Sequence, residues 1–149
     1  MNIEKIKATK GKLLGVDFGD VRTGIAVSDP SRMLALCLET IRAEGISNAA
    51  AAVAEVAKRE RVSAIIVGLP VNMDGSHGHR AERSQKFAQM LEELTGLPTE
   101  TVDERMTTMQ ASRYLNETDT RGKKRKAAID TLSAQIILQT ALDKLKNAQ

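Results

Sequence analysis

Hydrophobic and polar residues alternate in short blocks along most of the chain, and the spacing within each block predicts a strand or a helix. Three strands are predicted first, at residues 12–19, 23–29 and 33–41, because each is a short apolar or alternating run near glycine or proline. The pair Gly19-Asp20 between the first two runs is typical of a tight turn. The first two strands should therefore form an antiparallel hairpin.

Helical and strand patterns alternate through the rest of the chain. Ser47 is predicted to cap an alanine-rich helix that ends near Glu60. The run from Ala64 to Leu69 is continuously apolar, which is typical of a central strand covered on both faces. The remaining predicted elements are a helix at 79–94, a strand at 99–103, a helix from 107 or 108 to 115, and a helix at 125–145 that faces inward with Ile129, Leu132, Ile136 and Leu142.

This order of elements predicts an α/β fold. Consecutive strands joined by short turns pair antiparallel, whereas strands joined through a helix pair parallel by right-handed crossovers. We therefore expect a mixed five-stranded sheet, its first three strands antiparallel, with helices on both faces. Residues 11–149 show no linker and should form a single domain, and residues 1–10 should be a flexible polar lead-in.

The composition narrows the functions that such a domain could perform. The 149 residues contain only three aromatic side chains, Phe18, Phe87 and Tyr114, so a surface that stacks nucleic-acid bases on aromatic rings is not expected. The formal net charge of +3 is compatible with a phosphate-bearing partner.

The same composition indicates a compartment. Cys37 is the only cysteine, so no intramolecular disulfide can form, and a cytoplasmic location is expected. The first residues lack the apolar segment of a signal peptide. No apolar run approaches the length of a membrane span, so we expect no membrane partner.

Asp17 is the first residue that indicates chemistry, because it stands within a strand that should be central. A carboxylate placed there needs a cation, a hydrogen-bond donor or a positive side chain nearby. Asp17 could instead cap a turn or pair with Arg22 in the same hairpin.

Two further acids stand where they could join Asp17. Asp103 and Glu104 end the last predicted strand, and because successive strand residues point to opposite faces, only one of them can face Asp17. We choose Glu104 and keep Asp103 as the alternative. Asp130 lies in an early turn of an otherwise apolar helix, where the helix dipole alone could account for it.

Together, Asp17, Glu104 and Asp130 predict a catalytic metal centre. Three carboxylates suit Mg²⁺ or Mn²⁺, not Zn²⁺. Two such ions about 4 Å apart can activate water and stabilise the leaving oxygen of a phosphodiester. The residues therefore predict a metal-dependent nuclease.

A basic run precedes Asp130 and could hold the polymer. It comprises Arg121, Lys123, Lys124, Arg125 and Lys126, and Arg113 lies upstream of it. A solvated loop is the alternative interpretation of such a run. Asn72 follows the central strand, at the sheet edge where ligands bind in open α/β folds. His77 and His79 have too few companion ligands to predict zinc.

Four blocks of the sequence resemble the YqgF family of pre-16S rRNA nucleases, also described as Holliday junction resolvase-like proteins. The blocks are LLGVDFGDVRTGIAVSD, IIVGLPVNMDGSHGHRAE, VDERMTT and AAIDTLSAQIILQTALD, and the resemblance extends from Leu13 to Asp143. It implies a ribonuclease H-like fold with Asp17, Glu104 and Asp130 as the catalytic acids.

The family pattern also includes Arg22 and Arg105, which we count with the residues expected to contact nucleic acid. That group is Arg22, Asn72, Arg105, Arg113, Lys123, Lys124, Arg125 and Lys126. His77 is a departure, since the family often has an acid at this position.

The resemblance implies a hydrolase that processes the 5′ end of pre-16S rRNA, as an endonuclease or an exonuclease. Nothing in the sequence distinguishes ribose from deoxyribose, so cleavage of four-way DNA junctions by the same acids stays open. A third possibility is a non-catalytic module that binds nucleic acid through the basic run. The protein should act as a monomer or a homodimer.

Overall fold

The computed structural model describes residues 1–71, 74, 76–103 and 122–147, and for 122–128 it describes the backbone alone. Five strands form one sheet in the order β3-β2-β1-β4-β5. Strands β1, β2 and β3 pair antiparallel, whereas β4 pairs parallel with both β1 and β5. The bounds are β1 Leu13–Asp17, β2 Arg22–Ser28, β3 Ala35–Arg42, β4 Ala64–Leu69 and β5 Thr99–Asp103. The predicted mixed sheet is confirmed.

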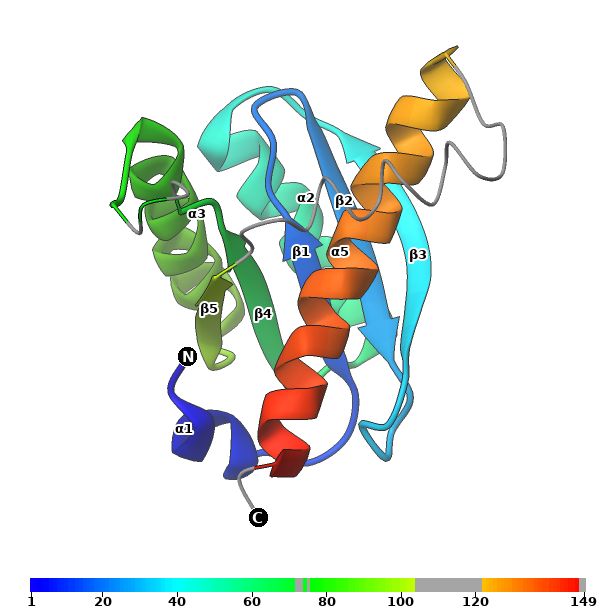
Figure 1. The fold of residues 1–149 in the computed structure, drawn as a ribbon, viewed down its shortest axis with the longest axis vertical. Coiled ribbons are helices and arrows are strands. Elements are labelled where there is room, and N and C mark those ends of the chain that lie inside the picture. The colour runs from blue at the N-terminus through cyan, green and yellow to red at the C-terminus, as the bar shows by residue number, and fades with distance from the viewer. Residues whose placement is uncertain (72–73, 75, 104–121, 148–149) are drawn as a thin grey trace.

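Helices cover both faces of the sheet. Helices α2 (Gly45–Glu60) and α3 (His79–Thr95) pack on one face, and α1 (Ile3–Lys7) and α5 (Gly122–Asn147) pack on the other. Figure 1 shows α5 crossing the sheet in front of β1, with α2 behind it. None of the helices that the structure describes is of a length and hydropathy that would let it cross a bilayer.

Strand β4 shows why two cores form. Ile65 and Val67 pack toward α2 and α3, whereas Ile66 packs toward α5, and all three side chains are fully buried. Alternate residues of a strand point to opposite faces, so a strand covered on both sides must be apolar throughout. The continuous apolar run in the sequence therefore predicted the position of β4 correctly.

Helix α2 begins earlier than the sequence predicts. Its cap residue is Glu44, whose backbone carbonyl accepts a hydrogen bond from the Asn48 side chain at 2.9 Å, and Ser47 lies inside the helix. The backbone N–H of Gly45 donates to the Asp20 carbonyl at 3.0 Å, which ties the start of α2 to the β1–β2 turn. The prediction of Ser47 as the cap is wrong because this long-range contact has no signature in the local sequence.

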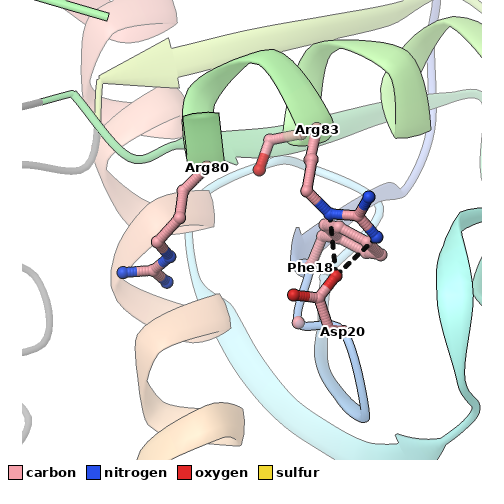
Figure 2. Close-up of a pocket in the computed structure, with 6 residues that line it drawn as sticks. Phe18, Asp20, Arg80 and Arg83 are labelled. Atoms are coloured by element: carbon pink, nitrogen blue, oxygen red, sulfur yellow. Dashed lines mark hydrogen bonds and ion pairs between the residues drawn. The ribbon is translucent and has the colours of Figure 1, made fainter. Parts of the chain in front are cut away.

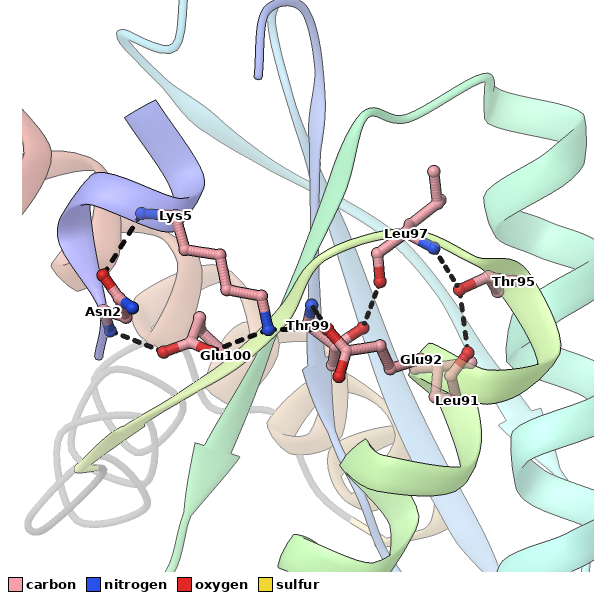
Figure 3. A network of polar contacts seen from close by, with 8 residues as sticks. All are labelled: Asn2, Lys5, Leu91, Glu92, Thr95, Leu97, Thr99 and Glu100. Atoms are coloured by element: carbon pink, nitrogen blue, oxygen red, sulfur yellow. Dashed lines mark hydrogen bonds and ion pairs between the residues drawn. The ribbon is translucent and has the colours of Figure 1, made fainter. Parts of the chain in front are cut away.

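Residues 1–10 contain a helix in place of the expected flexible lead-in. Ile6 of α1 is fully buried in the core beneath α5. Lys5 forms ion pairs with Glu92 at 2.6 Å and Glu100 at 3.3 Å, which join α1 to α3 and β5 (Figure 3). A helix that buries one residue leaves almost no periodicity, so the sequence pattern missed it.

The inward face of α5 also differs from the prediction. Leu142 is buried as expected, but Ile129, Leu132 and Ile136 are only partly buried. The buried residues of α5 are Ser133, Ala134, Ile137, Leu138, Ala141, Leu142 and Leu145. The helix is rotated relative to the expected face, and the contacts described next supply the reason.

Candidate active site

Asp17 is the last residue of β1 and faces α5. Leu13, Gly15 and Asp17 share one side of the strand, and Leu13 belongs to the core beneath α5. The parallel strands β1, β4 and β5 all end at this edge of the sheet. Asp17 therefore stands where sites form in open α/β sheets.

Two glycines let the backbone of α5 approach the sheet directly. Gly24 lies opposite Asp17 in the β1–β2 register, and a Cβ atom there would lie 2.0 Å from the Asp130 carbonyl oxygen. A Cβ atom on Gly15 would lie 2.6 Å from the Cβ of Leu138. Because no side chain separates α5 from β1 and β2 at these points, Asp130 lies close to Asp17.

Arg22 pairs with the acid on the helix. Its Nε donates to Asp130 Oδ2 at 2.9 Å. Arg22 and Gly24 share one face of β2, so the guanidinium reaches toward α5. The alternative in which Arg22 neutralises Asp17 within the hairpin is not what the structure shows, because the arginine pairs with Asp130.

The protein environment disfavours the charged form of both acids. Burial, and after it the negative charge of Asp130, raise the pKa of Asp17 to about 7, and the positive charge of Arg80 opposes the rise. Burial also raises the pKa of Asp130, against the hydrogen bond and positive charge of Arg22. Two poorly hydrated carboxylates that repel each other form a site that a cation would stabilise.

A cavity of about 380 Å³ opens above this pair of acids. It lies between the β1–β2 turn, the start of α3 and α5, and it is lined by Asp17, Phe18, Gly19, Asp20, Val21, Arg22, Arg80 and Asp130. Mg²⁺ is commonly held by one or two carboxylates together with substrate phosphates, so this donor set fits it. No group of three acidic, histidine or cysteine side chains suited to a metal occurs among the described residues.

The end of β5 separates the two neighbouring acids of the sequence. Asp103 lies opposite Leu69 in the register, and Val102 is buried in the core beneath α5. Because the two alternate, Asp103 lies on the α3 side of the sheet, away from the face that carries Asp17. Glu104 is the next residue and lies outside the described residues.

The other residues expected to contact nucleic acid are only partly placed. Asn72, Arg105 and Arg113 lie outside the described residues. The first turns of α5 contain four of the basic residues, for which the structure describes the backbone alone: Lys123, Lys124, Arg125 and Lys126. The backbone of α5 connects them to Asp130 within about one to two helical turns.

The structure adds two arginines that the sequence analysis did not select. Arg80 and Arg83 leave the first turns of α3 in different directions, and Arg83 reaches Asp20 of the β1–β2 turn at 2.6 Å (Figure 2). The available signal was their place in a helix that follows the loop after the central strand. That position is compatible with any surface arginine, so the sequence could not distinguish them.

An aromatic pair anchors the strand end that carries Asp17. The rings of Phe18 and Phe87 stack with their centroids 4.6 Å apart. Both side chains are buried, so neither ring is exposed for a base. The stack joins the residue that follows β1 to α3.

The chain is similar to proteins of one known family. Residues 11–144 match the profile of the RuvX family, described as Holliday junction resolvase. A "Putative pre-16S rRNA nuclease" of Caldanaerobacter subterraneus subsp. tengcongensis is 43% identical over 138 residues, which cover 92% of this chain and 99% of that protein. A relative of the same name in Leuconostoc citreum is 44% identical over 135 residues, covering 89% of this chain and 94% of the relative.

Solved structures are similar in fold at low sequence identity. RuvC of T. thermophilus, in complex with a Holliday junction substrate, aligns with a TM-score of 0.55 and 16% identity, covering 90% of this chain and 94% of that chain. The Fowlpox virus resolvase, in complex with Holliday junction DNA, aligns with a TM-score of 0.53 and 11% identity, covering 90% and 98%. The ribonuclease H-like fold class is thereby confirmed.

Proposed function

The chain belongs to the RuvX family, the same family as YqgF, and from this membership we propose that it is a metal-dependent nuclease that processes the 5′ end of pre-16S rRNA in the cytoplasm. The family and its relatives establish the coarser activity, which is hydrolysis of nucleic acid. One observation carries the finer proposal: Asp17 and Asp130 line the same cavity, at the edge of the sheet where the parallel strands end.

The proposed cofactor is Mg²⁺ or Mn²⁺, held by Asp17, Asp130 and Glu104. The position of Asp103 on the α3 side of the sheet supports Glu104 as the third ligand, because the next residue of an extended strand would point toward Asp17. When bound, such an ion activates water and neutralises the charge that develops on the phosphodiester.

Side chains of the protein would hold the metal ligands in place and position the nucleic-acid strand. Asp17 must lose its proton before it can act as a ligand, and its raised pKa makes that step depend on pH near neutrality. Arg22 holds the Asp130 carboxylate in place from β2. The basic first turns of α5 supply phosphate contacts that position the strand without reading its sequence.

The choice of ribosomal RNA is supported by the names of the relatives. Those at 43% and 44% identity carry the name of a pre-16S rRNA nuclease. The described residues that line the cavity do not by themselves distinguish ribose from deoxyribose. An assay on both substrates therefore decides between RNA and DNA.

A paired cleavage assay tests the proposal. Precursor RNA that spans the 5′ end of 16S rRNA and a four-way DNA junction are incubated in Mn²⁺ with the wild type, Asp17→Asn and Asp143→Asn. Asp143 is exposed near the far end of α5, so its substitution is a matched control. We expect the wild type and the control to cleave the RNA, and Asp17→Asn to lose at least about a hundredfold in rate. Full activity of Asp17→Asn, or of the wild type in chelator, would contradict the proposal.

Cleavage of four-way junctions is the second candidate, favoured by the description of the family and by the fold of RuvC. Junction resolution requires two symmetric cuts, so it needs a dimer with paired sites. Activity on the junction alone, together with a dimer in light scattering, would select this function. A monomer that cleaves only the RNA would exclude it.

The third candidate is a binding module without catalysis. Its prediction is RNA affinity that survives Asp17→Asn, together with the absence of cleavage in any divalent metal. The cleavage assay, together with light scattering and a titration of RNA binding, therefore separates all three functions.

A further inference from the structure

Arg80 occupies a position that the proposed reaction does not yet use. It is the second residue of α3, and its side chain is exposed. It lines the cavity above Asp17 and Asp130, and it also lines a second, smaller cavity. The side chain of Arg80 thus lies at the boundary between these two cavities.

The two cavities adjoin each other. The second has a volume of about 170 Å³ and shares Phe18, Gly19, Asp20 and Arg80 with the first. It adds Arg83 and Ser84, one turn further along α3. The surface is therefore hollowed from the pair of acids, past Arg80, along the start of α3.

The two arginines that line the smaller cavity, Arg80 and Arg83, differ in their polar contacts. Arg83 is engaged by Asp20, with its Nε at 2.9 Å and a terminal nitrogen at 2.6 Å from the same oxygen (Figure 2). Arg80 extends away from that pair and has no hydrogen-bonded partner among the residues that the structure describes. Its positive charge acts on Asp17 across the cavity. Among the described residues, Arg80 is thus a cation beside the acids that no ion pair engages.

A phosphodiester needs such a cation in order to approach two carboxylates. Every nucleotide carries a negative charge that Asp17 and Asp130 would repel wherever no cation compensates them, and a guanidinium that none of the described residues engages can offer two parallel N–H donors to a phosphate. Charge compensation of Asp17 alone would not require the side chain to stand exposed between two cavities.

We propose that Arg80 binds a backbone phosphate of the nucleic-acid strand, adjacent to the phosphodiester that is cleaved beside Asp17 and Asp130, and that the strand continues along the smaller cavity beside α3. The inference rests on the proposed function for the location of the cut. It adds a polymer contact on α3, on the side of the cavity opposite the basic turns of α5.

Binding measured separately from cleavage tests this role. Labelled single-stranded RNA from the 5′ leader is titrated by fluorescence anisotropy against the wild type, Arg80→Gln, Arg80→Lys and Lys86→Gln, over a series of salt concentrations. Lys86 is exposed on the same helix and lines neither cavity, so it controls for the loss of one charge. We expect Arg80→Gln to weaken binding roughly tenfold, Arg80→Lys to recover only part of the affinity because it keeps the charge but loses the paired donors, and Lys86→Gln to match the wild type.

The salt dependence identifies a phosphate contact. Loss of one contact should lower the slope of log affinity against log salt by about 0.7 for a single strand. A structural role would instead lower the thermal midpoint and leave this slope unchanged. If Arg80→Gln shows the affinity and slope of Lys86→Gln, the inference is wrong.

The outcomes for Arg80 and for the nuclease are distinguishable. A wild type that cleaves, with Arg80→Gln binding and cleaving normally, removes the inference and leaves the nuclease intact. A wild type that never cleaves, with the binding and slope of Arg80→Gln reduced, removes the nuclease and leaves the phosphate contact intact.

Discussion

At the scale of single residues, Asp17 is a carboxylate whose charged form folding disfavours. Its pKa rises from 3.8 to about 7 because the folded protein removes water from the carboxylate and places Asp130 beside it. Between about pH 4 and 7, the folded state therefore binds a proton that the unfolded state releases. The stability that this provides is complete below the unfolded pKa and is lost as the pH rises through the folded pKa.

This linkage predicts that Asp17→Asn stabilises the metal-free protein at neutral pH, because asparagine carries no charge to bury. In chelator, the thermal midpoint of the variant should exceed that of the wild type by several degrees at about pH 8, and the gap should shrink toward about pH 4. Thermal melts followed by circular dichroism measure it, with Asp143→Asn as the control. A gap that does not change with pH would contradict the prediction.

The same carboxylate predicts a response to divalent metal. Any ligand that binds only the folded protein raises its stability by mass action. At neutral pH, millimolar Mn²⁺ should raise the thermal midpoint of the wild type, and it should raise that of Asp17→Asn much less. Equal shifts in the two proteins would mean that the ion binds elsewhere.

At the scale of elements, the site depends on how closely α5 approaches the sheet. A helix that packs on a strand is normally held away by the side chains between them, but Gly15 and Gly24 remove those side chains. The face of α5 that meets the sheet is consequently the one with Ala134 and Leu138. This rotation, which the apolar pattern did not predict, also directs Asp130 toward Asp17.

Gly24→Ala should therefore disable the site. The new methyl group would lie 2.0 Å from the Asp130 carbonyl oxygen, so α5 has to move away from β2. We expect a loss of about 3 kcal/mol or more in the free energy of unfolding, measured with urea, and cleavage reduced at least about a hundredfold in the folded fraction.

Gly96→Ala provides the matched control for that experiment. Gly96 has a φ of +70° but nothing within 4 Å of the added Cβ atom, so only backbone strain is introduced. It should cost about 1 kcal/mol and leave cleavage unchanged. A Gly24→Ala protein that behaves like this control would contradict the proposed close contact.

At the scale of the whole molecule, the candidate site and the N-terminal helix lie at opposite ends of the sheet. The β1–β2 turn lies at the top of Figure 1, whereas α1 and the last turns of α5 lie at the bottom. The core beneath α5 spans both ends, with Ile6 packed in the same cluster as Leu142 and Leu145. Changes at α1 should therefore alter stability without altering chemistry.

Two substitutions in α1 test this separation. Ile6→Ala removes a fully buried side chain and should cost about 2–4 kcal/mol. Lys5→Ala removes ion pairs that are partly exposed and should cost no more than about 1 kcal/mol. Below the melting temperature, kcat/KM of both variants should equal that of the wild type. A large loss of activity at constant stability would show that the ends of the molecule are coupled.

Much of the fold follows from local pattern. The apolar run at 64–69 and the Gly19-Asp20 turn predict β4 and the hairpin, because burial on both faces and turn formation leave their signatures within a few residues. Asp17 and Asp130 could be selected for a similar reason, since a carboxylate among apolar neighbours is costly unless it has a partner, whereas Glu104 was selected by its place at the end of a strand. Glu104 remains a prediction, because it lies outside the described residues.

The meeting of particular side chains depends on contacts between distant segments, which leave no local signature. Gly24 and Asp130 are far apart in the sequence, yet the contact between them sets the rotation of α5. As a result, Arg22 forms its ion pair with Asp130 and not with Asp17. The proposed role of Arg80 also depends on tertiary structure, because the two cavities that it lines exist only when α3 packs beside the β1–β2 turn. The periodicity of apolar residues indicates which side of an element faces the core, whereas the packing of the elements against each other determines which side chains are in contact.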